Sequence, residues 1–348
     1  MDTDFGNREI IDRIIGIKQE LGNELVILTH HYQRKDIVDL GDHRGDSFAL
    51  AQRAARDENA KYIVFCGVHF MAESAAILAK DNQTVQIPDL NAGCWMADMA
   101  DAVLVERAWK EAVSVAGEER ITPIAYMNSD AHIKAHCGHY QGTVCTSSNA
   151  PAAFEWAFKR REKIFFFPDE HLGRNTAMGM DIPGDEVLVW DPEKPLGGNT
   201  KAAVEKAKVL LWKGYCLVHT RFTADQIRNM RENFPEASIV VHPECTHEVV
   251  SLADACGSTS FIVRYVTDAP ANSTIIIGTE INLIERLAAE HPDKKILPLH
   301  DSFCPNMYKI NLKNLLHTLE NIGRANIVTV DEGIKKDAFI ALENMLNL

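Results

Sequence analysis

Short apolar runs alternate with amphipathic stretches along the chain, and this alternation predicts strands that alternate with helices. Three of the runs end in polar side chains: Leu25–Leu28, Ile121–Ala125 and Ser238–Val241. Continuous apolar runs of this length are typical of parallel strands that are covered on both faces. A turn of small polar residues follows each run, and a helix follows each turn. The pattern therefore predicts three copies of one strand–turn–helix arrangement.

The three copies remain similar beyond the first helix. A second strand end comes 21 residues after the serine of each turn, and each copy ends in a cysteine: Cys94, Cys216 and Cys304. His30 lies 64 residues before Cys94 and His242 lies 62 before Cys304, whereas Tyr126 precedes Cys216 by 90. We assign the difference to an insertion at residues 191–214, with a helix expected over residues 201–211. A long internal repeat of this kind decides the architecture.

Strands that alternate with helices imply parallel sheets with ligand sites at the carboxyl ends of the strands. The sequence therefore predicts an α/β fold of three similar αβα units. We expect the parallel sheets to be arranged around a pseudo-threefold axis, with the active site in the central cavity. The predicted units are residues 1–105, 106–215 and 216–304, and the closing helices within 305–348 are expected to pack back on the first unit.

Polar residues at the strand ends are the candidates for catalysis and substrate binding. They are His30, Tyr32, Tyr126, Asn128, His242 and Glu244. Glu244 and His242 stand two residues apart, so both can project near one cavity. A carboxylate closed off from water would have its pKa raised towards neutrality, which suits a general base. The alternative is that these residues are separate helix caps and hydrogen-bonded core groups.

The turns that open the following helices are rich in hydroxyl groups. Ser47, Ser147, Ser258 and Thr259 stand in these turns. Hydroxyls, backbone N–H groups and the positive end of a helix suit a phosphate or carboxylate group. The same residue types are the usual helix N-caps, which is the alternative role.

Charge and composition limit the partners of the protein. The 348 residues carry a net charge of −13, which argues against nucleic acid and anionic membranes as main partners. No apolar run reaches the ~18 residues of a membrane-spanning helix, and the acidic, polar start MDTDFGNREI does not resemble a signal peptide. We therefore expect a soluble, cytoplasmic protein that acts on small molecules.

The eight cysteines include no C-x-x-C pair and are expected to be reduced thiols. Cys66, Cys137, Cys145 and Cys256 are expected to be small buried apolar residues. Cys94, Cys216 and Cys304 would instead converge at one edge of the cavity. Three thiolates can hold zinc with one open position, or three irons of a cubane with the fourth iron open. The spacing of the cysteines leaves both metals open.

Several ordered motifs resemble those of the quinolinate synthase family over nearly the whole chain. They include LTHHYQ (28–33), GDS (45–47), VHFMAE (68–73), AYMN (125–128), CTSSNA (145–150), FPD (167–169), CLVH (216–219), VHPE (241–244), GSTS (257–260), GTE (278–280) and CPNM (304–307). The family fold of three αβα units about a pseudo-threefold axis agrees with the repeat. His31 stands where several family members have Asn or Tyr, so it receives no role. The insertion occurs in only part of the family and is interpreted as surface elaboration.

The resemblance implies an enzyme of NAD biosynthesis. It implies condensation of iminoaspartate with dihydroxyacetone phosphate to quinolinate, with loss of phosphate and two waters. It further implies a [4Fe-4S] cluster on Cys94, Cys216 and Cys304, whose fourth iron binds substrate as a Lewis acid. Tyr126 and Asn128 would hold substrate oxygens. The imine is unstable in water, so transient contact with L-aspartate oxidase is also expected.

Two other functions stay open at this point. One is a non-catalytic iron–sulfur or metal-sensing protein, although such a protein has no need of His30, Tyr32, Tyr126, His242 and Glu244. The other is a zinc-dependent phosphosugar lyase or aldolase. A brown protein after anaerobic purification would rule out zinc alone.

Overall fold

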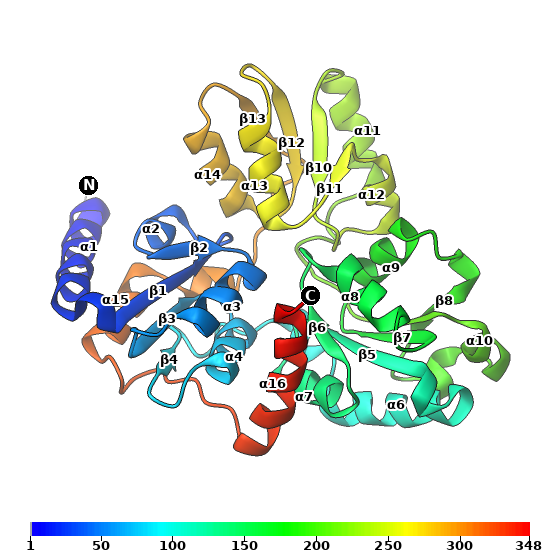
Figure 1. The fold of residues 1–348 in the computed structure, drawn as a ribbon. Helices are drawn as coiled ribbons and strands as arrows, with labels where there is room; N and C mark the ends of the chain where they lie inside the picture. The colour runs from blue at the N-terminus through cyan, green and yellow to red at the C-terminus, as the bar shows by residue number, and fades with distance from the viewer. Residues whose placement is uncertain (1) are drawn as a thin grey trace. The chain divides into compact units, whose positions relative to one another are not determined.

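The computed structural model describes residues 2–348, which form helices and three parallel sheets (Figure 1). The chain divides into two compact units. The first contains one sheet and consists of the chain up to Cys94 together with Glu280–Arg286 and Phe303–Val330. The second contains the other two sheets and consists of Trp95–Thr279, Leu287–Ser302 and Asp331–Leu348.

The sheet of the first unit has the strand order β2-β1-β3-β4, and every neighbouring pair is parallel. Its strands are β1 (Leu25–His30), β2 (His43–Gly45), β3 (Tyr62–Cys66) and β4 (Thr84–Gln86). The associated helices are α1 (Asp2–Leu21), α2 (Lys35–Val38), α3 (Ser47–Arg56), α4 (His69–Leu78) and α15 (Leu312–Glu320). All six residues of β1 are buried, as the continuous apolar run predicted.

The five-stranded sheet of the second unit has the order β6-β5-β7-β9-β8. Its strands are β5 (Ile121–Tyr126), β6 (Thr143–Cys145), β7 (Lys163–Phe167), β8 (Val187–Trp190) and β9 (Val209–Trp212). The helices of this region are α5 (Trp95–Asp98), α6 (Ala102–Ala116), α7 (Ala131–His139), α8 (Ala150–Phe158), α9 (Glu170–Gly179), α10 (Lys201–Lys206) and α16 (Glu332–Leu346). Aromatic rings fill its interior, with Phe165 stacked on Phe167 at 4.4 Å between ring centres.

The remaining sheet has the order β11-β10-β12-β13 and is also parallel. Its strands are β10 (Ser238–Val241), β11 (Ala255–Cys256), β12 (Thr274–Gly278) and β13 (Lys295–Pro298). The helices around it are α11 (Ala224–Asn233), α12 (His247–Leu252), α13 (Thr259–Asp268) and α14 (Ile281–Glu290).

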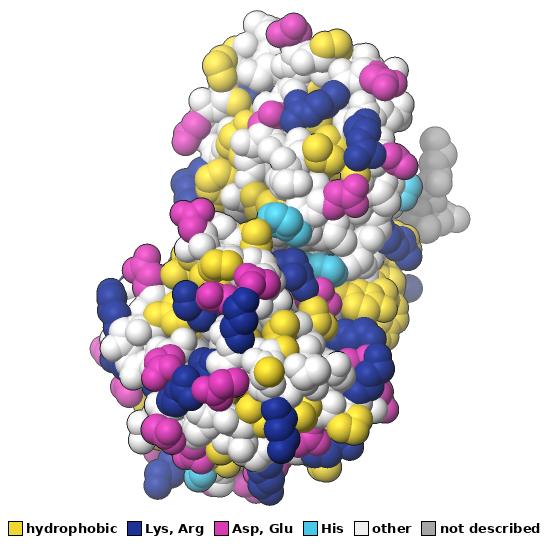
Figure 2. All heavy atoms as spheres, turned by 90° about the vertical axis from the view of Figure 1, so that its right-hand side faces the viewer, with side chains coloured by type: hydrophobic (Ala, Val, Ile, Leu, Met, Phe, Trp, Pro, Cys, Tyr) yellow, Lys and Arg dark blue, Asp and Glu magenta, His cyan; other side chains and the backbone are white. Residues whose placement is uncertain are grey.

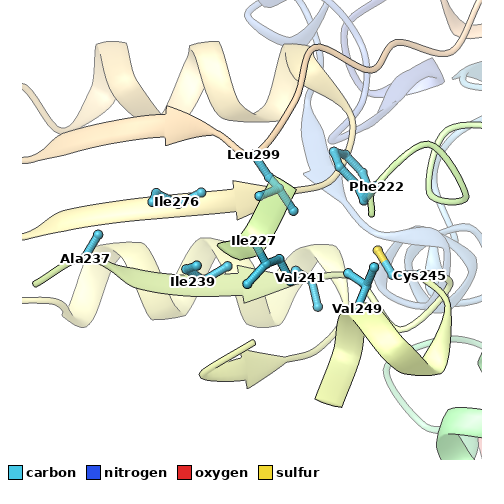
Figure 3. Packing of buried hydrophobic residues seen from close by; sticks show 9 residues of the cluster. All are labelled: Phe222, Ile227, Ala237, Ile239, Val241, Cys245, Val249, Ile276 and Leu299. Atoms are coloured by element: carbon cyan, nitrogen blue, oxygen red, sulfur yellow. The ribbon is translucent and has the colours of Figure 1, made fainter. Parts of the chain in front are cut away.

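One face of this sheet carries a compact apolar core. Ile239 and Val241 of β10 point from the same face towards Ile227 of α11 and Val249 of α12 (Figure 3). Their spacing of two residues follows from the alternation of side chains along a strand. Each fully buried aliphatic side chain of this kind contributes about 1.5–3 kcal/mol relative to exposure. The apolar run at residues 238–241 thus anchors the polar turn that follows it.

The three sheets share one strand order, which confirms the three similar αβα units. In each copy the first strand lies between the second and third strands of that copy. Asp42 and Asp254 even make the same contacts, since each carboxylate accepts from the backbone N–H of a central strand, at Ile27 and Ile239. The second strand of each copy lies on one side of β1, β5 or β10, and the third strand lies on the other side. Ligands of open α/β sheets bind at the carboxyl ends of strands where the chain changes side in this way. The arrangement of the three copies around a common axis stays a prediction, as do the boundaries at 105, 215 and 304.

Short second strands were missed by the pattern analysis. β2, β6 and β11 have only two or three residues each, and β2 is polar. Helix α12 ends at Leu252, and residues 255–256 form the short strand that pairs with β10. Runs this short give no alternating signal.

The insertion of the middle copy was also misplaced. β9 lies next to β7, in the position that β4 and β13 hold in the other copies, so residues 209–212 belong to the repeat. The additional segment comprises β8, at the sheet edge, and α10. The predicted helix over 201–211 is wrong in its second half, because α10 ends at Lys206 and the buried run Val209–Trp212 is a strand.

The two closing helices have different neighbours. α15 packs against α1 of the first unit, whereas α16 packs against α7 and β6. Gly138 permits this approach, since a Cβ there would stand 1.8 Å from the carbonyl oxygen of Asp337. The expectation that both closing helices pack on the first unit is therefore corrected for α16.

Charged side chains of both signs share the surface. Lys and Arg side chains are interspersed with Asp and Glu on the face drawn in Figure 2, rather than gathered in one basic stripe there. None of the helices within residues 2–348 has the length and apolar character that a membrane crossing requires.

Candidate functional site

The ends of β5 and β10 carry the candidate residues of the second unit. Tyr126 is the last residue of β5, and His242 follows β10 directly. The turn after β10 is closed by the N–H of Cys245, which bonds to the His242 carbonyl at 3.0 Å. The N–H of Glu244 donates to Nδ1 of His242 at 3.3 Å. Nδ1 of His242 is therefore an acceptor, and the neutral ring carries its proton on Nε2.

Glu244 is the centre of a buried hydrogen-bond network. Its carboxylate oxygen Oε1 accepts from the Tyr126 hydroxyl at 2.5 Å and from the Asn128 amide at 3.4 Å. The other oxygen, Oε2, lies 2.7 Å from Nδ1 of His219. Glu244 is only 2% exposed, so these bonds replace nearly all of its hydration. The structure thus brings together three predicted residues, Tyr126, Asn128 and Glu244.

The acidity of Glu244 differs from the expectation. Burial acts to raise its pKa, but the neighbouring His219 and His242, with hydrogen bonds from His219 and Tyr126, outweigh burial and lower the pKa to about 2. The prediction of a pKa near neutrality is therefore wrong, because it counted desolvation without the donors. Glu244 is ionised at neutral pH and acts as a fixed negative charge that orients Tyr126 and His219.

His219 is a site residue that the sequence analysis did not select. It lies after β9 and is 1% exposed. Since a carboxylate only accepts, Nδ1 of His219 donates to Glu244, and Nε2 then accepts from the Thr279 hydroxyl at 3.1 Å. Its ring stacks on His242 with centres 4.4 Å apart. The available signal was the motif CLVH, which places this histidine three residues after Cys216.

Asp169 is a second buried carboxyl group in this region. It caps α9 through Oδ1, which accepts from the N–H groups of His171 at 2.7 Å and Leu172 at 2.9 Å. Its Oδ2 is buried and has no hydrogen-bond partner among residues 2–348. Burial and the negative charge of Glu244 raise the pKa of Asp169 well above its usual value. Asp169 is therefore the neutral member of two nearby acids.

Cysteines separate into two groups by burial. Cys66, Cys137, Cys145 and Cys245 are buried, and burial raises the pKa of each thiol. Cys256 is half-buried, with its pKa raised by burial to about 12. The predicted ligands Cys94, Cys216 and Cys304 are also half-buried and lie outside the helices and strands. These three thiols suit metal binding better than the strand cysteines, because a ligand must reach the metal as a thiolate.

One group of potential metal ligands occurs in the part of the chain that the structure describes. Ligand atoms of Cys216, His219 and Glu244 all lie within 4.8 Å of one another. His219 and Glu244 already satisfy each other, however, and His219 also bonds to Thr279. We therefore interpret these two as a polar network beside the Cys216 thiol.

His30 and Tyr32 form the equivalent tip in the first unit. His30 is the last residue of β1, and its Nδ1 accepts from the N–H of Tyr32 at 3.2 Å, as His242 does from Glu244. The two rings meet edge to face at 4.9 Å. The next residue, His31, accepts from the Arg286 guanidinium at 3.0 Å. Burial, with the nearby His30 and Arg286, lowers the pKa of His31 to about 3.

Glu280 and Asn282 support this tip and were not selected from the sequence. The Asn282 amide donates to the carbonyl of Tyr32 and to Glu280, both at 3.1 Å. Glu280 also accepts from the backbone N–H of Cys304 at 3.3 Å. Burial raises the pKa of Glu280 to about 8. The segment carrying a predicted metal ligand is thus tied to the tip that carries Tyr32.

Helix-opening hydroxyls have different local roles. Asp46 caps α3, so Ser47 is the first helical residue. Ser147 lies in the turn before α8 and is half-buried. Ser258 caps α13 by accepting from the N–H of Phe261 at 3.3 Å, and Thr259 beside it is buried. The capping alternative therefore holds for Ser258, although its hydroxyl proton can still be donated to a ligand.

Comparison with known proteins places this chain in a family. The family model described as "Quinolinate synthetase A protein" matches residues 12–347. The chain is 48% identical to a quinolinate synthase of Corynebacterium glutamicum over 345 residues, 98% of this chain and 88% of that protein. It is 47% identical to a quinolinate synthase of Bacillus cereus over 339 residues, 96% of this chain and 92% of that protein. A quinolinate synthase of Bacillus thuringiensis matches at the same identity and coverage.

Proposed function

The chain belongs to the quinolinate synthetase A family, and we propose that it condenses iminoaspartate with dihydroxyacetone phosphate. The products would be quinolinate, phosphate and two waters, in the biosynthesis of NAD. All carbon, nitrogen, oxygen and hydrogen atoms of the two substrates are accounted for in these products. The reaction therefore requires proton transfers and eliminations but no electron acceptor.

The buried network around Glu244 is the observation that carries the proposal. An ionised carboxylate with a tyrosine hydroxyl at 2.5 Å and a histidine at 2.7 Å can hold donors in fixed directions beside a reacting molecule. Tyr126 would move a proton to and from substrate oxygen, since Glu244 keeps its hydroxyl oriented. Asn128 would bind substrate, because its Oδ1 is buried without a hydrogen-bond partner within residues 2–348.

Two imidazoles would serve the proton transfers at carbon and oxygen. His242 accepts from a backbone N–H through Nδ1, and so does His30 in the first unit. In both rings Nε2 is then the nitrogen that exchanges protons with a ligand. His30 with Tyr32 would act on the triose carbonyl, and His242 would act on the iminoaspartate portion. Glu244 supports these steps as a charge rather than as the primary base.

We propose that Cys94, Cys216 and Cys304 hold a [4Fe-4S] cluster. Their half-buried positions outside the helices and strands support this choice over the buried strand cysteines. When bound, the cluster would supply an open iron as a Lewis acid for a hydroxyl or carboxylate of the substrate. Each of the three cysteines lies in a loop, and the loop of Cys304 is held by the hydrogen bond from its backbone N–H to Glu280.

The hydroxyl-rich turns would bind the phosphate of the triose. The first residues of α3 and α13 are Ser47 and Thr259, and Ser258 directly precedes α13. Ser147 lies in the turn before α8. Helix N-termini and hydroxyl groups favour a phosphate dianion. Loss of that phosphate during the reaction would be assisted by the same donors.

The chemistry of the imine also indicates a partner. Iminoaspartate hydrolyses in water, so its source must be close, and we propose transient contact with L-aspartate oxidase. Neither nucleic acid nor a membrane is proposed as a partner, and the proposed location is the cytoplasm.

An anaerobic assay tests the proposal. Protein purified without oxygen should be brown, contain iron and acid-labile sulfide in equal amounts, and form quinolinate from the two substrates. Zinc without iron would favour the phosphosugar lyase or aldolase. Iron and sulfide without quinolinate formation would favour a metal-sensing protein.

A further inference from the structure

α9 connects two segments that carry site residues in the second unit. The N–H of Glu170, at its start, bonds to the carbonyl of Gly214 at 2.8 Å, two residues before Cys216. Asn175, further along α9, contacts the turn that carries Glu244. No proposed role in the reaction includes Asn175.

The amide of Asn175 is fully used by that turn and its neighbour. Nδ2 donates to the carbonyl of Pro243 at 2.9 Å and to the carbonyl of Cys245 at 2.8 Å. Oδ1 lies 2.9 Å from Nδ1 of His247. Two carbonyls require the nitrogen end of the amide, so the oxygen end accepts from a protonated Nδ1 of His247.

The two carbonyls are those on either side of Glu244. The N–H groups of Glu244 and Cys245 are bound by His242 within the same turn. Asn175 supplies the donors for the carbonyls of Pro243 and Cys245, so the backbone around Glu244 is held from both sides. The short contacts of the Glu244 carboxylate, at 2.5 and 2.7 Å, depend on this backbone position.

We propose that Asn175 is a positioning residue that fixes the turn at residues 243–245 and thereby aims the Glu244 carboxylate at Tyr126 and His219. This inference rests on the proposed function of the Glu244 network. A misplacement of about 1 Å in an active site can cost about 100-fold in rate. Loss of the two hydrogen bonds from Asn175 to this turn therefore reduces turnover while leaving the substrate-binding hydroxyls in place.

The test compares Asn175→Ala with Asn199→Ala. Asn199 is a matched control in the same unit, because its amide also donates to several carbonyls, at Val189, Leu196 and Gly197. We expect Asn175→Ala to lower kcat by about 10–100-fold, with KM within about twofold of wild type. Asn199→Ala should lose comparable thermal stability but keep its kcat. His247→Ala, which removes the partner of Oδ1, should fall between wild type and Asn175→Ala.

Hydrogen–deuterium exchange of the peptide covering residues 242–247 provides a readout independent of catalysis. Exchange there should accelerate in Asn175→Ala and remain at the wild-type rate in Asn199→Ala. Wild-type kcat in Asn175→Ala, an equal loss in Asn199→Ala, or unchanged exchange would each overturn the inference. If Asn175→Ala does not fold, the test rests on His247→Ala. A wild-type kcat together with a wild-type exchange rate in His247→Ala would then overturn the inference. A wild-type protein that makes no quinolinate would refute the proposed function. The exchange experiment would still test whether Asn175 holds the turn at residues 243–245.

Discussion

Nδ1 of His219 lies 2.7 Å from Oε2 of Glu244, and both side chains are buried. This bond joins the segment after β9, which also carries Cys216, to the turn after β10. Removing either partner would leave Oε2 of Glu244 or Nδ1 of His219 buried without this bond, which costs more than the bond itself contributes. The pair therefore determines both the shape and the charge of the site.

Glu244→Gln should abolish most of the turnover while the protein stays folded. A glutamine presents an acceptor at only one end, so it cannot accept from both Tyr126 and His219. We expect kcat to fall by roughly 10²–10⁴-fold. Steady-state kinetics and a thermal melt of the same preparation measure this. A variant that melts earlier yet turns over normally would show that the carboxylate is structural.

Replacement of a predicted cluster ligand should remove the cluster. Cys94→Ala, Cys216→Ala and Cys304→Ala should each lose iron, sulfide and activity, because two thiolates hold a cubane poorly. Cys66→Ala is the control, since that thiol is buried and its pKa is raised. Iron and sulfide analysis after anaerobic purification distinguishes these variants. Full iron content in Cys304→Ala would contradict the assignment.

His31→Gln should make the protein less sensitive to acid. The pKa of His31 is lowered to about 3 in the folded state from 6.5, so the unfolded chain binds more protons between these values. Stability therefore falls as the pH decreases from about 6.5 towards 3. A glutamine oxygen can still accept from Arg286 but does not titrate. Urea unfolding at pH 7 and pH 4.5 should show a smaller difference for the variant, and an equal difference would refute this origin.

Ser258→Ala should weaken binding of the phosphorylated substrate by about 1–2 kcal/mol, or about 5–30-fold. Loss of its cap should also cost about 1 kcal/mol of stability. Thr223→Ala separates the two effects, because Thr223 caps α11 with the same 3.3 Å contact and is proposed to bind no ligand. Apparent affinity for dihydroxyacetone phosphate should change only in Ser258→Ala. A change for iminoaspartate alone would place the phosphate elsewhere.

Repeated apolar runs made most of the fold predictable. Residues 239–241 are buried as expected, and the equivalent runs at residues 25–28 and 121–125 begin β1 and β5. Local sequence did not reveal that Val209–Trp212 is a sheet strand, because the preceding helical pattern runs up to it. Pairing with β7, which is distant in sequence, decides that segment.

Residues of the Glu244 network were predictable only where they follow the first strand of a copy. Glu244 and Tyr126 were found in this way, and the resemblance to a family strengthened the choice. The ionised state of Glu244 depends on donors from β5 and from the segment after β9, so its spacing from His242 could not predict it. Asn175 lies on the side of a helix, where nothing in the local sequence distinguishes it from a surface residue.

Asp169→Asn should leave the folded protein at least as stable as wild type at neutral pH. The raised pKa means that folded Asp169 keeps its proton above about pH 4, where the unfolded chain has lost it. Wild-type stability therefore decreases as the pH rises from about 4 towards the folded pKa, and the asparagine variant lacks this dependence. Its amide oxygen can still cap α9 at His171 and Leu172. Asp169→Ala removes the cap as well, and should be less stable than Asp169→Asn by about 1 kcal/mol. Thermal melts at pH 5 and pH 8 test this. The advantage of Asp169→Asn over wild type should be larger at pH 8, and an advantage that is equal at both pH values would show that Asp169 is ionised in the fold.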